Sequence, residues 1–309
     1  MLNQLNKKII FLFLVLIITI MEFLSQAGKE KVLDSRFVEY FSLSNKDIDK
    51  IDDEIQDINK EISQDAYTIQ LIQSLGNEQI LYLAMDVTFP DNIKLKDLVK
   101  EEGLLNILPE NILLVEDIIE EDDIKDLSYI KLKDSLLGKK YYQLSRSYIP
   151  YIDIDQNTIY YIFCFSAGVS SIKSDMLSVI INGFDYSIGD DVISTTSQNY
   201  VISWKFSNKG TIIKAQIIDD YGDITGNITL SKFSLNVHFY HSDYDSTGDA
   251  ISSIIIKTNN GDIIEIKGPL SSSFSNNTGE LTIKKFFQQI VPIEEIQSIE
   301  ISDYIIKYI

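Results

Sequence analysis

The chain has 309 residues, a formal net charge of -19 and a single cysteine. So acidic a surface repels phosphate backbones and excludes nucleic acid as a partner, and anionic wall polymers are poor partners except through bridging cations. One cysteine excludes an internal disulfide. Beyond the first 27 residues about 280 remain, enough for two domains of ordinary size.

The first residues have the layout of an export signal. Lys7 and Lys8 precede an apolar run from Ile9 to Met21, and the small residues Ser25 and Ala27 lie three and one positions before a possible cut at Gly28. This order of basic, apolar and small residues is typical of a secretory signal peptide. Residues 1–27 are therefore predicted to be a signal peptide, with everything after them exported.

A membrane anchor is the alternative interpretation of the same segment. The apolar run is shorter than the roughly 17–25 residues of a membrane-spanning helix. Phe23 and Leu24 would lengthen the run to 16 residues if Glu22 lay at the membrane interface, and the anchor would then span residues 7–24. The protein would then be held in the cytoplasmic membrane and face outward, whereas cleavage after residue 27 would release it.

Residues 44–62 are predicted to form one amphipathic helix. Their isoleucines recur at alternating steps of three and four, which favours a single apolar stripe; they are Ile48, Ile51, Ile55, Ile58 and Ile62. Ser44 followed by Asp47 is a plausible N-terminal cap. We expect a helical stalk over 28–64 that packs against the next domain, with a short coiled coil as the alternative.

From Tyr67 the apolar period changes to two, which predicts strands. Residues 67–75 and 79–89 flank a turn at 76–78, and the second strand places Leu81, Leu83, Met85, Val87 and Phe89 on one face. Further strands are expected at 141–147 and 158–165. Residues 65–170 are predicted to form a first β-sandwich domain.

The second half of the chain is almost entirely strand-like. Short apolar runs alternate with turns, as is typical of a β-sandwich, and residues 171–309 are predicted to form the second one. One strand is expected over 228–240. Asn259 to Asp262 predict a tight hairpin turn, because Asn and Gly accept positive φ.

Several of these segments resemble one known family. They are Tyr67–Phe89, Gly226–Leu235, Thr258–Asp262 and Phe286–Ile301. Over about residues 65–309 the chain is similar to the extracytoplasmic domain of unknown function in anti-sigma-factor-like membrane proteins of low-GC Gram-positive bacteria. The resemblance implies a mainly β fold with two immunoglobulin-like sandwich domains, following an N-terminal hydrophobic helix and a short amphipathic helix.

The resemblance also implies a function without enzymatic activity. We expect a binding or sensory module at the cell envelope whose partner is an envelope or membrane protein. Sigma-binding members carry a cytoplasmic domain before the membrane segment, whereas only about eight residues precede it here, so sigma-factor binding is not expected. The alternatives are a self-associating structural protein of the envelope and a hydrolase acting on the cell wall.

One acidic turn is a candidate calcium site. Asp243, Asp245 and Asp249 place oxygen ligands near a glycine, as calcium loops do. Ile254 occupies the position where an EF-hand loop needs a bidentate glutamate, and an ordinary acidic turn is the favoured interpretation. Residues 219–223 form a second acidic turn. No other cofactor is expected.

The remaining candidates have structural explanations. Seven carboxylates in residues 116–126 predict a solvated segment, with a grip on a basic partner as the alternative. His238 and His241 would lie on opposite faces of a strand, which argues against a shared zinc ion. Cys164 is expected to be a buried hydrophobe and Trp204 a core residue. The tyrosine pairs 141–142 and 160–161 suit strands, and a sugar-binding surface is their functional alternative.

Overall fold

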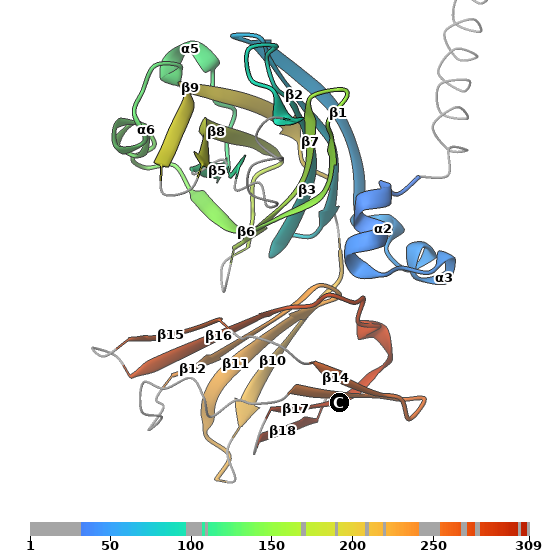
Figure 1. Ribbon diagram of the computed structural model, residues 1–309. Helices are drawn as coiled ribbons and strands as arrows, with labels where there is room; N and C mark the ends of the chain where they lie inside the picture. The colour runs from blue at the N-terminus through green and yellow to red at the C-terminus, as the bar shows by residue number, and fades with distance from the viewer. Residues whose placement is uncertain are drawn as a thin grey trace, which may run out of the picture. The chain divides into compact units, whose positions relative to one another are not determined.

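The computed structural model describes residues 32–96, 107–108, 111–167, 171–188, 191–207, 210–218, 221–240, 254–266, 271–275, 279–301 and 304–307. The chain divides into two compact units, Met1–Val32 and Leu33–Ile309. All elements below belong to the second unit, which is mainly β with antiparallel sheets (Figure 1). The predicted hydrophobic helix at the N-terminus lies outside the described residues.

The helices are short. They are α2 (Ser35–Phe41), α3 (Asn45–Asp49), α5 (Glu121–Ile124), α6 (Tyr129–Ser135) and the 3-10 turns η1 (Asp52–Glu54) and η3 (Ile293–Glu295). α5 and α6 cover the outer side of the first sheet, where Leu132 and Ile124 pack with Leu113 and Ile180. No helix in the described ranges is long and apolar enough to cross a bilayer.

A nine-stranded sheet occupies the first two thirds of the unit. Its path is β1-β2-β3-β7-β6-β5-β8-β4, with β9 paired to β8. The strands are β1 (Ile55–Gln64), β2 (Tyr67–Gly76), β3 (Ile80–Thr88), β4 (Ile107–Leu108), β5 (Ile112–Val115), β6 (Tyr141–Asp153), β7 (Thr158–Ser166), β8 (Met176–Ile188) and β9 (Asp191–Lys205).

The sheet curls until β1 and β9 lie side by side (Figure 1). β1 reaches β9 through side chains, because Gln56 donates to the Lys205 carbonyl and Lys60 donates to the Ser203 carbonyl. Apolar residues on the concave side meet in one core. The predicted face of β3 is confirmed, since all five of its residues belong to this core.

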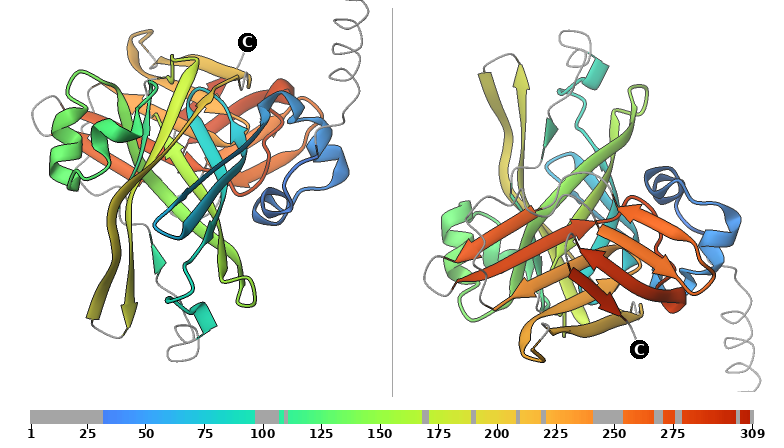
Figure 2. Two further views of the ribbon diagram at one scale, coloured as in Figure 1. Left: turned by 90° about the horizontal axis from the view of Figure 1, so that it is seen from above. Right: turned by 90° about the horizontal axis from the view of Figure 1, so that it is seen from below.

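Two smaller sheets follow. The five-stranded sheet runs β10-β11-β12-β16-β15 and the four-stranded sheet β14-β13-β17-β18. The strands are β10 (Ile212–Ile218), β11 (Ile224–Ser231), β12 (Ser234–Phe239), β13 (Ile254–Thr258), β14 (Ile263–Ile266), β15 (Ser271–Ser275), β16 (Glu280–Phe286), β17 (Ile296–Ile301) and β18 (Tyr304–Lys307). Residues of both sheets share one apolar core, so the sheets pack face to face (Figure 2).

The predicted helix over 44–62, and with it the helical stalk over 28–64, is wrong beyond residue 49. β1 occupies Ile55–Gln64 and pairs with β2 along its length. A bulge between Asp57 and Lys60, where Asn59 has a φ of 49°, shifts the alternation. The isoleucines at helical spacing do not form one stripe, because Ile55 packs with Phe37 and Phe41 whereas Ile58 and Ile62 pack against the core of the first sheet. β-Branched side chains suit the strand.

The strands are also distributed differently than predicted. β8 and β9, which were expected in the second sandwich, belong to the nine-stranded sheet through the pairing of β8 with β5. The expected boundary at residue 171 therefore falls inside that sheet. The single strand expected over 228–240 is a hairpin, β11 and β12, with a turn at Lys232 and Phe233. The turn at Asn259–Asp262 is confirmed between β13 and β14.

Substitution of Phe37 tests whether α2 is part of the core. The side chain is fully buried against β2, β3 and β7, so Phe37→Ala should lower the free energy of unfolding by about 3–5 kcal/mol. Urea unfolding followed by circular dichroism measures this. Tyr221→Ala is the matched control, because that ring is 93% exposed. Equal midpoints for the two variants would mean that α2 is a free stalk.

Candidate functional site

The predicted calcium ligands Asp243, Asp245 and Asp249 lie outside the described residues, and so does His241. The calcium hypothesis therefore stays a prediction. Within the described part of the chain, no three His, Cys, Asp or Glu side chains lie close enough together to hold a metal ion.

The predicted structural roles of the remaining single residues agree with their surroundings. Cys164 is buried, and burial raises the pKa of its thiol to about 12, so the nucleophilic thiolate is absent at neutral pH. Trp204 is a core residue, as expected. His238 lies beside Thr282, with 2.9 Å between Nδ1 and Oγ1, and its ring meets Tyr240 edge-on.

The acidic segment 116–126 is only partly solvated. Glu116 lies at the end of β5, where its carboxylate accepts from the Tyr142 hydroxyl, from Lys140 and from the backbone N–H groups of Lys173 and Ser174. Burial opposes ionisation, but these donors outweigh it and hold the pKa of Glu116 below its usual value. Glu116 thus fastens the loop before β8, while Asp122 is exposed as predicted.

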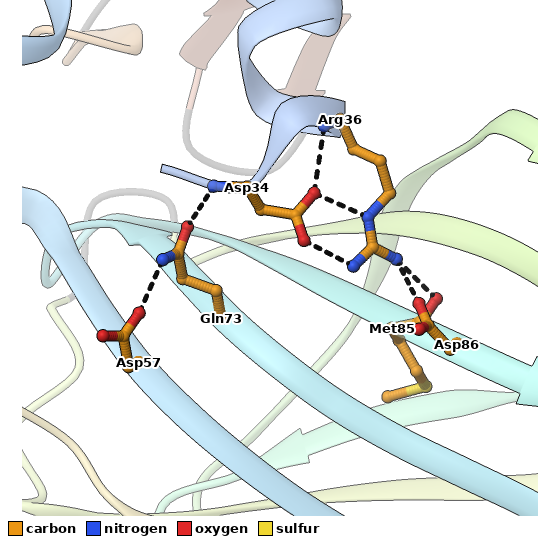
Figure 3. Close-up of polar contacts among 6 residues, drawn as sticks. All are labelled: Asp34, Arg36, Asp57, Gln73, Met85 and Asp86. Atoms are coloured by element: carbon orange, nitrogen blue, oxygen red, sulfur yellow. Dashed lines mark hydrogen bonds and ion pairs between the residues drawn. The ribbon is translucent and has the colours of Figure 1, made fainter. Parts of the chain in front are cut away.

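A buried guanidinium fixes α2 to the first sheet (Figure 3). Asp34 caps the helix, and its carboxylate accepts from Nε and Nη2 of Arg36, both at 2.7 Å. The remaining nitrogen, Nη1, donates to Asp86 at 2.5 Å and to the Met85 carbonyl at 3.2 Å. Gln73 extends the network from the Asp34 backbone to the Asp57 carboxylate.

The two carboxylates on Arg36 are not equivalent. For Asp34, burial raises the pKa, but the hydrogen bonds and charge of Arg36 outweigh it, so the pKa is lowered. For Asp86, burial dominates over the single bond from Arg36, and the pKa is raised. The polar groups of this network bind one another. This pairing indicates that the network stabilises the fold and is not a reactive centre.

Apolar contacts connect α2 to the C-terminal half. Phe41 of α2 meets Tyr82 of β3 at 5.0 Å between ring centroids and Phe233 of the β11–β12 turn at 5.5 Å. Phe286, at the end of β16, belongs to the same cluster. The outer face of the first sheet, α2 and the five-stranded sheet thus share one small core.

A cluster of ion pairs lies at the same contact between the first sheet and the C-terminal half, which we call the junction. The buried ammonium of Lys232 lies 3.2 Å from Glu54 and 3.2 Å from Glu294, and it also donates to the Lys50 carbonyl. Burial raises the pKa of Glu54, and Lys232 offsets part of that rise. Since the cluster is internally paired, its role is to hold the 50–54 segment against the β11–β12 turn.

The outer face of β6 presents exposed aromatic side chains, and a bulge brings two of them to the same face. Tyr148 lies opposite Ile162 and Tyr151 lies opposite Tyr160, with a register shift between the two pairs. The shift places Tyr148 and Tyr151 on the same face despite their spacing of three. The sequence signal for it is Pro150, because proline in a strand marks an edge or a bulge. Sequence analysis ended this strand at residue 147 and missed it.

The tyrosine pairs named from the sequence contribute unequally to that face. Tyr142 and Tyr161 are buried, whereas Tyr160 is half-exposed and packs against Tyr151 at 5.4 Å. Tyr40 of α2 approaches Tyr148 at 5.2 Å. Together Tyr40, Tyr148, Tyr151 and Tyr160 form what we call the tyrosine row.

Removal of the Arg36 charge should destabilise the fold in a pH-dependent way. Arg36→Met leaves two buried carboxylates without a cation, which lowers the free energy of unfolding by about 3–5 kcal/mol at neutral pH. Without Arg36, burial raises both carboxyl pKa values above those of the unfolded chain. The folded variant then binds protons more tightly, and its deficit shrinks as the pH falls toward about 4.

Urea unfolding at several pH values measures this deficit. The control is Lys94→Met, whose ion pair with Asp91 is solvent-exposed and should contribute nothing measurable. A deficit that stays constant between neutral and mildly acidic pH would contradict the assignment of two buried carboxylates to Arg36.

Comparison with known proteins adds little. No family model matches the chain, and no curated protein matches it. A crystal structure of a conserved domain protein from Bacillus anthracis is 10% identical, with a TM-score of 0.41 over 79% of this chain and 75% of that one. A likeness at this level carries no argument about function.

Proposed function

We propose that this protein is a non-enzymatic binding or sensory module that works outside the cytoplasm at the cell envelope. The observation that carries the proposal is the tyrosine row, an exposed aromatic surface built on a packed sheet. Tyr148 is 38% exposed and Tyr151 is 58% exposed. Both belong to β6, whose neighbouring residues Ile149 and Ile152 pack against the inner core.

Such a surface suits recognition. Tyrosine offers a large apolar face and a hydroxyl, and it loses little conformational freedom on binding because it has only two side-chain torsions. A rigid sheet holds the rings in place before the ligand arrives, which reduces the entropy lost on binding. These properties favour a binding module over a structural filler.

The described reactive groups argue for binding rather than catalysis. Cys164 is held as a thiol by burial, and the carboxylates of Asp34 and Asp86 are both bound to Arg36. Neither group is available as a nucleophile or general base. A wall hydrolase would instead need two carboxylates facing each other across a cleft, about 5–10 Å apart.

The location outside the cytoplasm is supported by the first 27 residues. Their basic, apolar and small-residue order favours export. The finer fold assignment, two immunoglobulin-like sandwiches of the anti-sigma-factor-like type, is part of the same proposal. It is supported by the antiparallel pairing and by the face-to-face core of the two smaller sheets.

Envelope binding should depend on the tyrosine row. The double variant Tyr148→Ala/Tyr151→Ala should bind isolated cell envelopes at least about tenfold more weakly than the unchanged protein, because two aromatic anchors are lost. Co-sedimentation of the purified protein with envelopes from the native cells measures this. Tyr221→Ala, a fully exposed tyrosine elsewhere, is the matched control. Equal binding by the double variant and the unchanged protein would contradict the proposal.

Cell fractionation with intact-mass measurement tests the location. A protein lacking residues 1–27 in the medium is expected if the signal is cleaved. The full-length mass in the membrane fraction is expected if residues 7–24 anchor the chain. Full-length protein in the cytoplasmic fraction would contradict export in either form.

A further inference from the structure

Arg146 lies at one end of the tyrosine row. Its guanidinium lies 4.7 Å from the centroid of the Phe286 ring. It is also close to Tyr40, since burial raises the pKa of that hydroxyl and Arg146 acts in the opposite direction. Among the described residues no carboxylate lies within ion-pair distance of Arg146.

Arg36 provides the comparison within the same protein. It too lies near an aromatic ring, 5.6 Å from the centroid of Tyr160, but it binds Asp34 and Asp86. In a chain with 46 acidic and 27 basic residues, Arg146 is half-buried and, within the described part of the chain, is not paired with a carboxylate. A guanidinium presents paired N–H donors that match a carboxylate in geometry and charge.

A second cationic side chain, Lys285, lies near Arg146. Burial and the nearby Arg146 charge both lower the pKa of Lys285. Two cations close to each other in a partly buried place raise the local potential and favour an incoming anion. Both side chains come from the junction between the two halves, where ligand sites are common.

The geometry of β6 sets the charge and the rings in one line. Arg146 lies opposite Cys164, Tyr148 opposite Ile162 and Tyr151 opposite Tyr160, so all three point to the outer face. Successive positions on one face of a strand are roughly 6.8 Å apart. A ligand along this line meets a cation first and aromatic faces after it.

The edge of β6 argues against an extended peptide as that ligand. In the described residues the 146–153 part of β6 pairs with β7 on one side alone. Pro150 has no N–H to donate, and the bulge beside it bends the strand. Strand addition by a peptide is therefore disfavoured, and recognition by the side chains on the outer face is favoured.

We propose that the tyrosine row binds a mostly neutral glycan through one carboxylated sugar, with Arg146 holding the carboxylate and Tyr148 and Tyr151 stacking on the sugar rings. This inference rests on the proposed function and names its ligand. The glycan is mostly neutral because the net charge of -19 repels a densely charged polyanion.

Calorimetric titration of the purified full chain with three soluble probes tests the inference. The probes are a disaccharide of glucuronic acid and N-acetylglucosamine, the same disaccharide with glucose in place of the acid, and a short glutamate-containing peptide. We expect the acidic disaccharide to bind at least about tenfold more tightly than the other two, because only it satisfies both Arg146 and the rings. Its affinity should fall as salt rises.

Two variants of Arg146 measure the contribution of its charge to binding separately from that of the tyrosine rings. Arg146→Gln should weaken binding of the acidic disaccharide about tenfold without changing that of the neutral one, whereas Arg146→Lys should restore part of the loss. Lys94→Gln, an exposed lysine, is the matched control, and urea midpoints verify folding. Preference for the neutral disaccharide or the peptide, or full binding by Arg146→Gln, would overturn the inference.

The outcome also distinguishes this inference from the proposed function. If the double tyrosine variant loses envelope binding but no acidic disaccharide binds the unchanged protein, the glycan assignment fails and the binding module stands. If the double variant retains envelope binding, the proposed function itself fails.

Discussion

The attachment of α2 to the outer face of the first sheet is the constraint on which the junction depends. Arg36 is held between Asp34 and Asp86, and Phe37 and Phe41 fill the space beneath it. Neither contact would persist alone, since a buried guanidinium needs carboxylates and a seven-residue helix is unstable in water. Together they turn a short helix into part of the core.

That attachment also shapes the surface. With α2 in place, Tyr40 lies beside Tyr148, and Phe41 reaches Phe233 of the C-terminal half. Phe286 arrives from β16 and lies against Arg146. The tyrosine row thus draws on α2, β6 and β7, whereas the three groups proposed to bind the ligand, Arg146, Tyr148 and Tyr151, all belong to β6.

Strand bulges explain where the sequence patterns mislead. In β1 the bulge near Asn59 shifts the alternation, and the isoleucines at helical spacing divide between the two faces, with Ile55 in the outer cluster and Ile58 and Ile62 against the inner core. In β6 the bulge near Pro150 turns two tyrosines at a spacing of three to one face. Period-two patterns without a bulge, as in β3, were interpreted correctly, because alternation then maps directly onto the two faces of a sheet.

The sequence by itself determined the mainly β class, the buried faces of β3, the turn at Asn259–Asp262 and the core positions of Cys164 and Trp204. These follow from local alternation and turn chemistry, which short windows of sequence contain. The tertiary structure alone decided that β8 joins β5, that Arg36 meets Asp86 across about fifty residues, and that Arg146 meets Phe286. Such contacts depend on the path of the whole chain, because strand pairing and charge pairing over long separations leave no local pattern.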